Sequence, residues 1–87
     1  MQISYHRDFR KSYKKLNPKI QARFKERRNL FFQNPIHPLL NNHELVGEWS
    51  RCRSINVGGD IRAIFRITQN ERIEFLAIGT HHELFGL

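Results

Sequence analysis

The sequence predicts an α+β fold in which an N-terminal strand and a basic two-helix hairpin pack on one face of a mainly antiparallel sheet, followed by a short C-terminal helix or turn. Two patterns indicate this class. Apolar residues recur at helical spacing between residues 8 and 33, and they alternate with period two between residues 50 and 79. A chain of 87 residues can bury one hydrophobic core, so we expect a single domain covering residues 1–87.

The first third of the chain reads as a strand and two helices. Residues 2–5 predict a short strand, and Asp8 is the expected N-cap of the first helix. The apolar stripe of that helix consists of Phe9, Tyr13 and Leu16. Asn17 and Pro18 supply a cap and a first helical residue for the second helix, which we expect to end before Pro35. Its expected buried stripe consists of Ile20, Phe24, Leu30 and Phe31.

The remainder predicts a loop and a three-strand antiparallel meander. Residues 34–48 are rich in Asn and Pro, which favours a loop. Strands are expected at residues 50–57, 61–67 and 73–78, and the last ends at Gly79. Turns containing Gly58-Gly59 and Gln69-Asn70 separate them. With the helices on one face of the sheet, the other face is expected to be open and to offer a substrate cradle.

The chain is strongly basic, and its charge is concentrated near the N-terminus. The net charge is +7; residues 1–28 hold ten Lys and Arg against two acidic residues, and residues 29–87 hold five against six. Each Lys or Arg that meets a phosphate releases a condensed counterion, so nucleic acid is the leading partner class, ahead of an anionic membrane surface. A solvated helix face or an acidic protein partner would also account for the excess.

Cysteine usage and hydropathy favour a cytoplasmic protein. Cys52 is alone, which excludes an intramolecular disulfide and a thiolate cluster within one chain. The first residues lack the apolar stretch of a signal peptide, and no apolar run approaches the length of a membrane span. We therefore expect a cytoplasmic protein with no membrane partner.

The candidate chemistry needs no metal or cofactor. The sequence has no Gly-rich phosphate loop, no Cys/His set with zinc spacing and no acidic cluster for Mg²⁺. What remains is His43, Asp60, Arg62, the pair His81-His82 and, after them, Phe85. RNA carries its own nucleophile, the 2′-hydroxyl, so strand scission needs a base, an acid and a cation for the phosphorane. Histidine and arginine suit these roles.

Structural interpretations of the same residues stay open at this point. An exposed His in a basic protein of this size is more often incidental than catalytic. Arg62 is equally compatible with a strand-surface pairing to Glu74, and Phe85 with a cap on the core. The adjacent pair His81-His82 is a poor metal site, because neighbouring residues seldom ligate one ion.

Several motifs resemble the RelE superfamily of toxins, and most closely its YafQ branch. They are His43-Glu44-Leu45-x-Gly47-x-Trp49, then Arg53, then residues 59–65 (GDIRAIF), and finally Gly79-Thr80-His81-x-x-Leu84-Phe85-Gly86. The closing motif is the most specific, and the order of strand, helical hairpin and meander also agrees. The resemblance therefore spans nearly the whole chain and implies a RelE-like, microbial-RNase-like fold.

The resemblance also implies the roles of individual residues. His43 and His81 match two histidines important for YafQ-type cleavage, Asp60 an acidic site residue and Phe85 a C-terminal aromatic residue. Arg62 falls where RelE-type toxins carry an arginine that engages the scissile phosphate. One departure is Asn56, which stands where YafQ-type proteins have a further His; Asn can hydrogen-bond a phosphate or base but cannot carry a proton.

These implications define a ribosome-dependent mRNA interferase without cofactor, the toxin of a type II toxin–antitoxin system. The expected partners are mRNA on the ribosome, a cognate antitoxin, and operator DNA through the toxin–antitoxin complex. The residues expected to bind RNA are Lys11, Lys14, Lys15, Arg51, Arg53, Asn56 and His82. Two alternatives stay open: a non-catalytic RNA- or DNA-binding module, and a degenerate toxin that acts only as an interaction protein.

Overall fold

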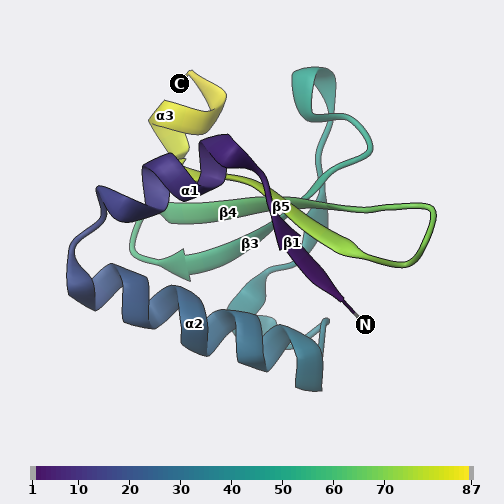
Figure 1. The fold of residues 1–87 in the computed structure, drawn as a ribbon, viewed down its shortest axis with the longest axis horizontal. Helices are drawn as coiled ribbons and strands as arrows, with labels where there is room; N and C mark the ends of the chain where they lie inside the picture. The colour runs from purple at the N-terminus through teal and green to yellow at the C-terminus, as the bar shows by residue number, and fades with distance from the viewer. Residues whose placement is uncertain (1, 87) are drawn as a thin grey trace.

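A computed structural model describes residues 2–86 and contains a five-stranded mixed sheet with three α-helices (Figure 1). The strands lie in the order β1-β5-β4-β3-β2; β1 pairs with β5 in parallel, and the other pairs are antiparallel. The predicted α+β class and mainly antiparallel sheet are thus confirmed. The elements are β1 (Ile3–Tyr5), α1 (Arg7–Lys14), α2 (Pro18–Gln33), β2 (His43–Glu44), β3 (Arg53–Gly58), β4 (Ile61–Ile67), β5 (Ile73–Thr80) and α3 (His81–Phe85).

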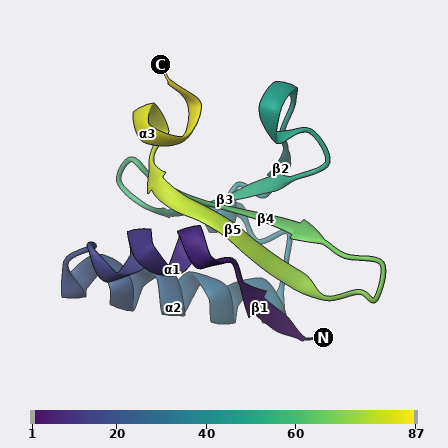
Figure 2. The ribbon, with the colours of Figure 1, turned by 45° about the horizontal axis from the view of Figure 1, so that its top comes forward.

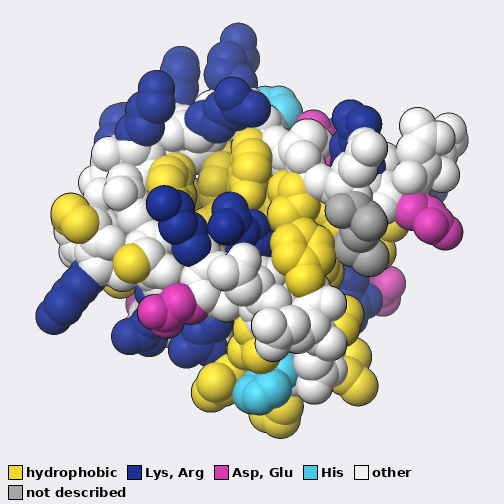
Figure 3. Space-filling model, turned by 60° about the horizontal axis from the view of Figure 1, so that its bottom comes forward, with side chains coloured by type: hydrophobic (Ala, Val, Ile, Leu, Met, Phe, Trp, Pro, Cys, Tyr) yellow, Lys and Arg dark blue, Asp and Glu magenta, His cyan; other side chains and the backbone are white. Residues whose placement is uncertain are grey.

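The two long helices run in opposite directions and cover one face of the sheet (Figure 2). The α2 helix starts as predicted, with Pro18 in its first turn and the Asn17 side chain accepting the Ile20 N–H at 2.9 Å. Lys and Arg side chains gather on the outward side of this helical layer (Figure 3). None of the helices in the described part of the chain is long and apolar enough to cross a membrane.

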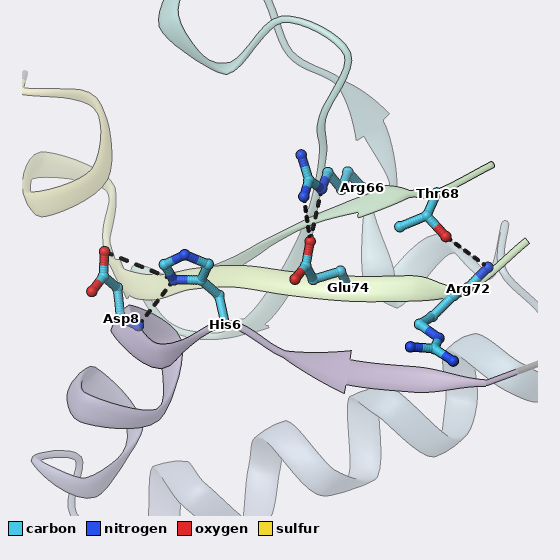
Figure 4. Close-up of polar contacts among 6 residues, drawn as sticks. All are labelled: His6, Asp8, Arg66, Thr68, Arg72 and Glu74. Atoms are coloured by element: carbon cyan, nitrogen blue, oxygen red, sulfur yellow. Dashed lines mark hydrogen bonds and ion pairs between the residues drawn. The ribbon is translucent and has the colours of Figure 1, made fainter. Parts of the chain in front are cut away.

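The predicted N-cap of α1 is wrong by two residues. The cap is His6, whose Nδ1 accepts the Asp8 N–H at 3.0 Å, while Asp8 lies in the first turn (Figure 4). His6 has the extended backbone that a cap needs, and its N–H donates to the Phe75 carbonyl of β5. The neighbouring strand therefore fixes where the helix begins, and Asp8 instead places a carboxylate near the positive end of α1.

Aromatic side chains fill the core between the helices and the sheet. Phe24 of α2 lies with its ring centroid 5.2 Å from Phe9 and 5.1 Å from Phe75. Phe31 packs edge-on against Phe65 of β4 at 5.0 Å. The predicted helical stripes thus face the core, although only Phe9, Phe24 and Phe31 are fully buried and the other members are half-buried.

The first strand of the meander begins later than predicted, and the last one ends later. The strand expected at residues 50–57 begins only at Arg53, because Ser50 and Arg51 form a turn after a 3-10 helix, Gly47–Trp49. Residues 34–48, expected to be a loop, also contain the 3-10 helix Pro38–Leu40 and the short strand β2. The last strand continues through Gly79 to Thr80.

The second face of the sheet is not open, contrary to expectation. Ser54 of β3 and Ile64 of β4 are fully buried, yet neither belongs to the core cluster under the helices. The segment after β2 and helix α3 rise on this side of the sheet (Figure 2). The indole Nε1–H of Trp49 donates to the Leu84 carbonyl at 3.1 Å and so joins the two segments. They enclose a recess rather than leaving a flat face.

Candidate active site

The recess on the second face is a cavity of about 390 Å³ to which four segments contribute. Three of its polar or charged lining residues come from separate elements: His43 from β2, Arg62 from β4 and His81 from α3. The meander brings them together because β2 lies at one edge of the sheet while α3 follows directly on β5. Apolar walls complete the cavity, formed by Leu45, Val46, Trp49, Leu84 and Phe85.

His81 is held by the start of α3. Thr80 and Glu83 form a capping box: Thr80 Oγ1 accepts the Glu83 N–H at 3.1 Å, and Glu83 Oε1 accepts the Thr80 N–H at 2.8 Å. Hydrogen bonds to the Glu83 carboxylate from Thr80, first from its backbone N–H and then from its side chain, hold the pKa of Glu83 below its usual range. The His81 N–H donates to the Asp60 carbonyl, and its ring lies 4.8 Å from Phe85, one turn later. The backbone of His81 is therefore held at the start of the helical turn, and its ring rests against Phe85 at the end of that turn.

His43 is exposed and its ring is oriented by one hydrogen bond. Nδ1 lies 2.8 Å from the Asn41 carbonyl oxygen. A carbonyl only accepts hydrogen bonds, so Nδ1 must carry the hydrogen in this contact. In the neutral ring, Nε2 is then the unprotonated nitrogen, which is the form that a general base requires.

Arg62 is half-buried at the start of β4, with a loosely held guanidinium. Its Nη1 donates to the Gly59 and Ile61 carbonyls at 3.2 and 3.4 Å, near the upper limit for such bonds. The proposed pairing of Arg62 with Glu74 is wrong. Glu74 lies opposite Arg66 in the sheet, and its Oε1 accepts from Nε and Nη2 of that residue at 2.8 and 2.7 Å (Figure 4). The guanidinium of Arg62 therefore has no carboxylate partner among the described residues.

Asp60 and Asn56 lie near this cavity without lining it. Asp60 is exposed in the β3–β4 turn and lines a separate depression with Lys19 and Arg23. Asn56 of β3 is half-buried and lies directly opposite Arg62. Its side-chain carbonyl oxygen is buried and has no hydrogen-bond partner among the described residues.

The remaining residues predicted to bind RNA are spread over the surface. Arg53 donates to Asn42 Oδ1 at 2.7 Å, and Arg51 is exposed in a turn with a positive φ of 70°. His82 is exposed on α3 next to His81. The lysines Lys11, Lys14 and Lys15 are exposed on α1 and at its C-cap, and Lys15 lines a depression that also includes Glu83 and Leu84 of α3.

The cavity also includes residues that sequence reasoning did not single out as site residues. Ser54 is fully buried at the cavity, and its hydroxyl has no partner among residues 2–86. Leu84 and Trp49 form a wall of the cavity, although from the sequence they were recognised only as members of the motifs and had no assigned role. A signal for Ser54 exists in hindsight: it is a small polar residue in an otherwise apolar stretch of β3.

The arrangement suits acid–base chemistry on a phosphodiester. Two imidazoles can exchange protons, a guanidinium can bind a phosphate oxygen, and Phe85 offers a ring to a base. Within residues 2–86, no group of three or more His, Cys, Asp or Glu side chains is arranged to hold a metal ion.

Comparison with known proteins identifies the family. A family model described as the bacterial toxin of the type II toxin-antitoxin system, YafQ, matches residues 1–86. The crystal structure of YafQ from E. coli strain BL21(DE3) is 26% identical over 98% of both chains, with a TM-score of 0.82. A chain of the E. coli DinJ-YafQ toxin-antitoxin complex is 26% identical over 98% of this chain and 97% of that chain, with a TM-score of 0.79.

A more distant structure shares the fold alone. The YoeB/ParE toxin from Agrobacterium tumefaciens is 14% identical and covers 93% of this chain and 99% of its own, with a TM-score of 0.77. A search of curated proteins finds no match. The match over nearly the whole chain, together with the agreement in fold, shows that this protein belongs to the YafQ family of bacterial toxins of type II toxin–antitoxin systems.

Proposed function

We propose that this toxin is a metal-independent endoribonuclease that cleaves mRNA on the ribosome. The observation that carries the proposal is the convergence of His43, Arg62 and His81 on one cavity of about 390 Å³. Family membership supports it, because the cavity residues coincide with the motifs that resemble YafQ-type toxins. The sequence motifs and the cavity geometry therefore favour the same reaction.

The proposed reaction uses the RNA's own nucleophile. His43 Nε2 takes the proton from the 2′-hydroxyl, and that oxygen attacks the adjacent phosphorus. The guanidinium of Arg62 stabilises the negative charge on the non-bridging oxygens of the phosphorane. His81 donates a proton to the departing 5′-oxygen, so the P–O5′ bond breaks and leaves a 2′,3′-cyclic phosphate and a 5′-hydroxyl. Phe85 stacks on a base next to the scissile bond.

Residues around the cavity guide the RNA in this proposal. Asp60 supports the site from the β3–β4 turn, where its backbone carbonyl accepts a hydrogen bond from the His81 N–H. In this proposal Arg51, Arg53 and His82 contact RNA outside the cleavage point. The lysines of α1 contact the ribosome or the antitoxin, because none of them lines the cavity.

The proposed partners follow from the family. The related YafQ occurs in a crystal structure with DinJ, so we propose that a cognate antitoxin binds and neutralises this toxin. A basic toxin and an acidic antitoxin segment would associate quickly by electrostatic steering. Operator DNA is contacted by the toxin–antitoxin complex, mainly through the antitoxin, and the site of action is the cytoplasm.

The test is induced expression in bacteria without antitoxin, followed by mapping of mRNA 5′ ends. We expect growth arrest and new 5′-hydroxyl ends within coding regions, and neither with His81→Ala. Purified protein that has been treated with EDTA to remove contaminating metal is expected to cleave mRNA on ribosomes as fast as untreated protein. If His43→Ala and His81→Ala both keep full toxicity, the protein is a non-catalytic binding module. If the wild type causes no arrest, the degenerate-toxin alternative holds.

A further inference from the structure

Two buried polar atoms on β3 face the cavity side of the sheet without a partner. They are Ser54 Oγ and Asn56 Oδ1, and neither has a hydrogen bond among residues 2–86. A buried polar atom without a protein partner destabilises a fold, so such an atom is available to a partner acquired in another state. For Asn56, the sheet register identifies a candidate for that partner.

Arg62 lies directly opposite Asn56 in the antiparallel pair of β3 and β4. Side chains at directly opposite positions project from the same face with Cβ atoms about 5 Å apart. The guanidinium carries five N–H donors, yet the hydrogen bonds recorded for it are two long ones from Nη1 to the carbonyls of the β3–β4 turn. An unused acceptor thus lies beside a cation that is weakly held.

The chemistry of the buried atom decides what it can bind. Oδ1 of Asn56 is an acceptor, and the non-bridging oxygens of a phosphate are acceptors too, so this atom cannot bind the phosphate itself. Its partner must be a donor, and the donor supplied by the neighbouring strand is the guanidinium of Arg62.

We propose that Asn56 is a positioning residue for Arg62. When the guanidinium leaves the turn carbonyls to engage the scissile phosphate, Asn56 Oδ1 accepts one of its N–H groups. The plane of the fork is thereby fixed against the phosphate oxygens, which is the geometry that bidentate binding requires. The inference rests on the proposed nuclease function. It gives Asn56 a role through Arg62 and not as a proton carrier, which its amide cannot be.

A double-mutant cycle tests the coupling. Single-turnover cleavage of ribosome-bound mRNA is measured for Asn56→Ala, Arg62→Ala and the double variant. We expect Asn56→Ala to lose about tenfold or more in rate, as for other positioning defects, and to lose nothing further in the Arg62→Ala background. The melting temperature of Asn56→Ala is expected to stay level or rise, because a buried unpartnered atom is removed. Asn70→Ala, in the exposed β4–β5 turn, is the matched control and should cleave at the wild-type rate.

Three outcomes would overturn the proposal. Wild-type cleavage by Asn56→Ala would show that the contact does not matter. An equal loss in both backgrounds would show that Asn56 acts on RNA independently of Arg62. A melting temperature lowered by several degrees would assign the defect to folding.

A second measurement separates this inference from the nuclease proposal. The Nε–H signal of Arg62 is followed by NMR while a short 2′-O-methyl RNA, which cannot be cleaved by this reaction, is added to the full chain. We expect this signal to show that the Arg62 side chain becomes ordered on RNA binding in the wild type and stays mobile in Asn56→Ala. If the wild type never cleaves mRNA but this difference is seen, the nuclease proposal fails and the positioning role stands. If the signal responds equally in both proteins, or in neither, the positioning role is wrong.

Discussion

His43 and His81 reach the same cavity from supports of very different rigidity. His81 lies on a helical turn closed by the capping box of Thr80 and Glu83, and its N–H is bonded to the Asp60 carbonyl. His43 is exposed on a two-residue strand and is oriented by one contact, to Asn41. A proton donor that is already in place has more effect on a rate than one that must be ordered by substrate.

At the residue scale, we therefore predict that His81→Ala costs more than His43→Ala. Loss of the general acid should slow single-turnover cleavage of ribosome-bound mRNA about a hundredfold or more, and loss of the base less, because ribosomal groups can accept the 2′-hydroxyl proton. The control is His37→Asn, which lies outside the cavity and keeps a side chain able to cap the 3-10 helix that follows it. A folded His81→Ala protein that keeps most of its rate would assign the acid to another residue, with His82 or Arg62 tested next.

Candidate site residues could be chosen from the sequence where chemistry alone constrains them, whereas contacts that depend on packing could not be predicted. Histidine and arginine stood out because proton transfer and phosphate binding need those side chains. The pairing of Glu74 with Arg66 instead of Arg62 depends on a register that no local pattern defines, since residues 62, 64 and 66 share one alternation. The cap at His6 instead of Asp8 likewise depends on a hydrogen bond to β5, a strand distant in sequence.

At the element scale, the α3 helix has only five residues and depends on its cap. Thr80→Ala removes the hydroxyl that accepts the Glu83 N–H, which typically destabilises a protein by about 1 kcal/mol. For a domain of this size, that corresponds to a fall in melting temperature of roughly 4–8 °C. We expect cleavage to weaken as well, because His81 follows Thr80 directly. Thr80→Ser keeps the hydroxyl and should restore both quantities; failure to do so would remove the capping explanation.

The capping box also predicts a pH dependence. Hydrogen bonds from Thr80 lower the pKa of Glu83 in the folded protein, so the carboxylate stabilises the fold above its unfolded pKa, and this contribution is lost as the pH falls through the folded pKa. Glu83→Gln keeps a side-chain acceptor that does not titrate. We expect the stability advantage of the wild type over Glu83→Gln at neutral pH to shrink when the pH is lowered below about 4.3, the ordinary pKa of glutamate. Parallel melting curves at the two pH values would contradict this.

Elements were predictable from the sequence in proportion to their length. The two helices and the strands β4 and β5 each contain enough residues to show a period, and Asn17-Pro18 marks the start of α2 directly. Strand β2 has two residues, too few for any alternation, and exists because it pairs with Arg53 and Ser54 of β3. The folding of residues 45–52 over the second face had no local signal either, because it depends on Trp49 meeting Leu84.

At the scale of the whole molecule, most of the basic helical hairpin and the candidate active site lie on different sides of the sheet. The basic hairpin faces outward from one layer, and the cavity lies beyond the sheet on the other side (Figures 2 and 3). We predict that reversing Lys11, Lys14 and Lys15 to Glu weakens ribosome binding at least tenfold at physiological salt and reduces the steepness of its salt dependence. At saturating protein, the single-turnover rate should equal that of the wild type. Unchanged ribosome binding, or a lower single-turnover rate at saturating protein, would show that these lysines do not serve ribosome binding alone.

The parallel pairing of β1 with β5 joins residues 3–5 to residues 73–75. The order of biosynthesis therefore determines when the toxin becomes active. A nascent chain can form α1 and α2 early, but their apolar faces have no sheet to cover until β3, β4 and β5 have been made, and His81 is added later still. A nascent chain that ends before α3 lacks His81, Leu84 and Phe85, which line the cavity. Under the proposed function, a nascent chain therefore cannot cleave mRNA until α3 has been synthesised, and an antitoxin made earlier can bind the toxin as soon as the cavity forms.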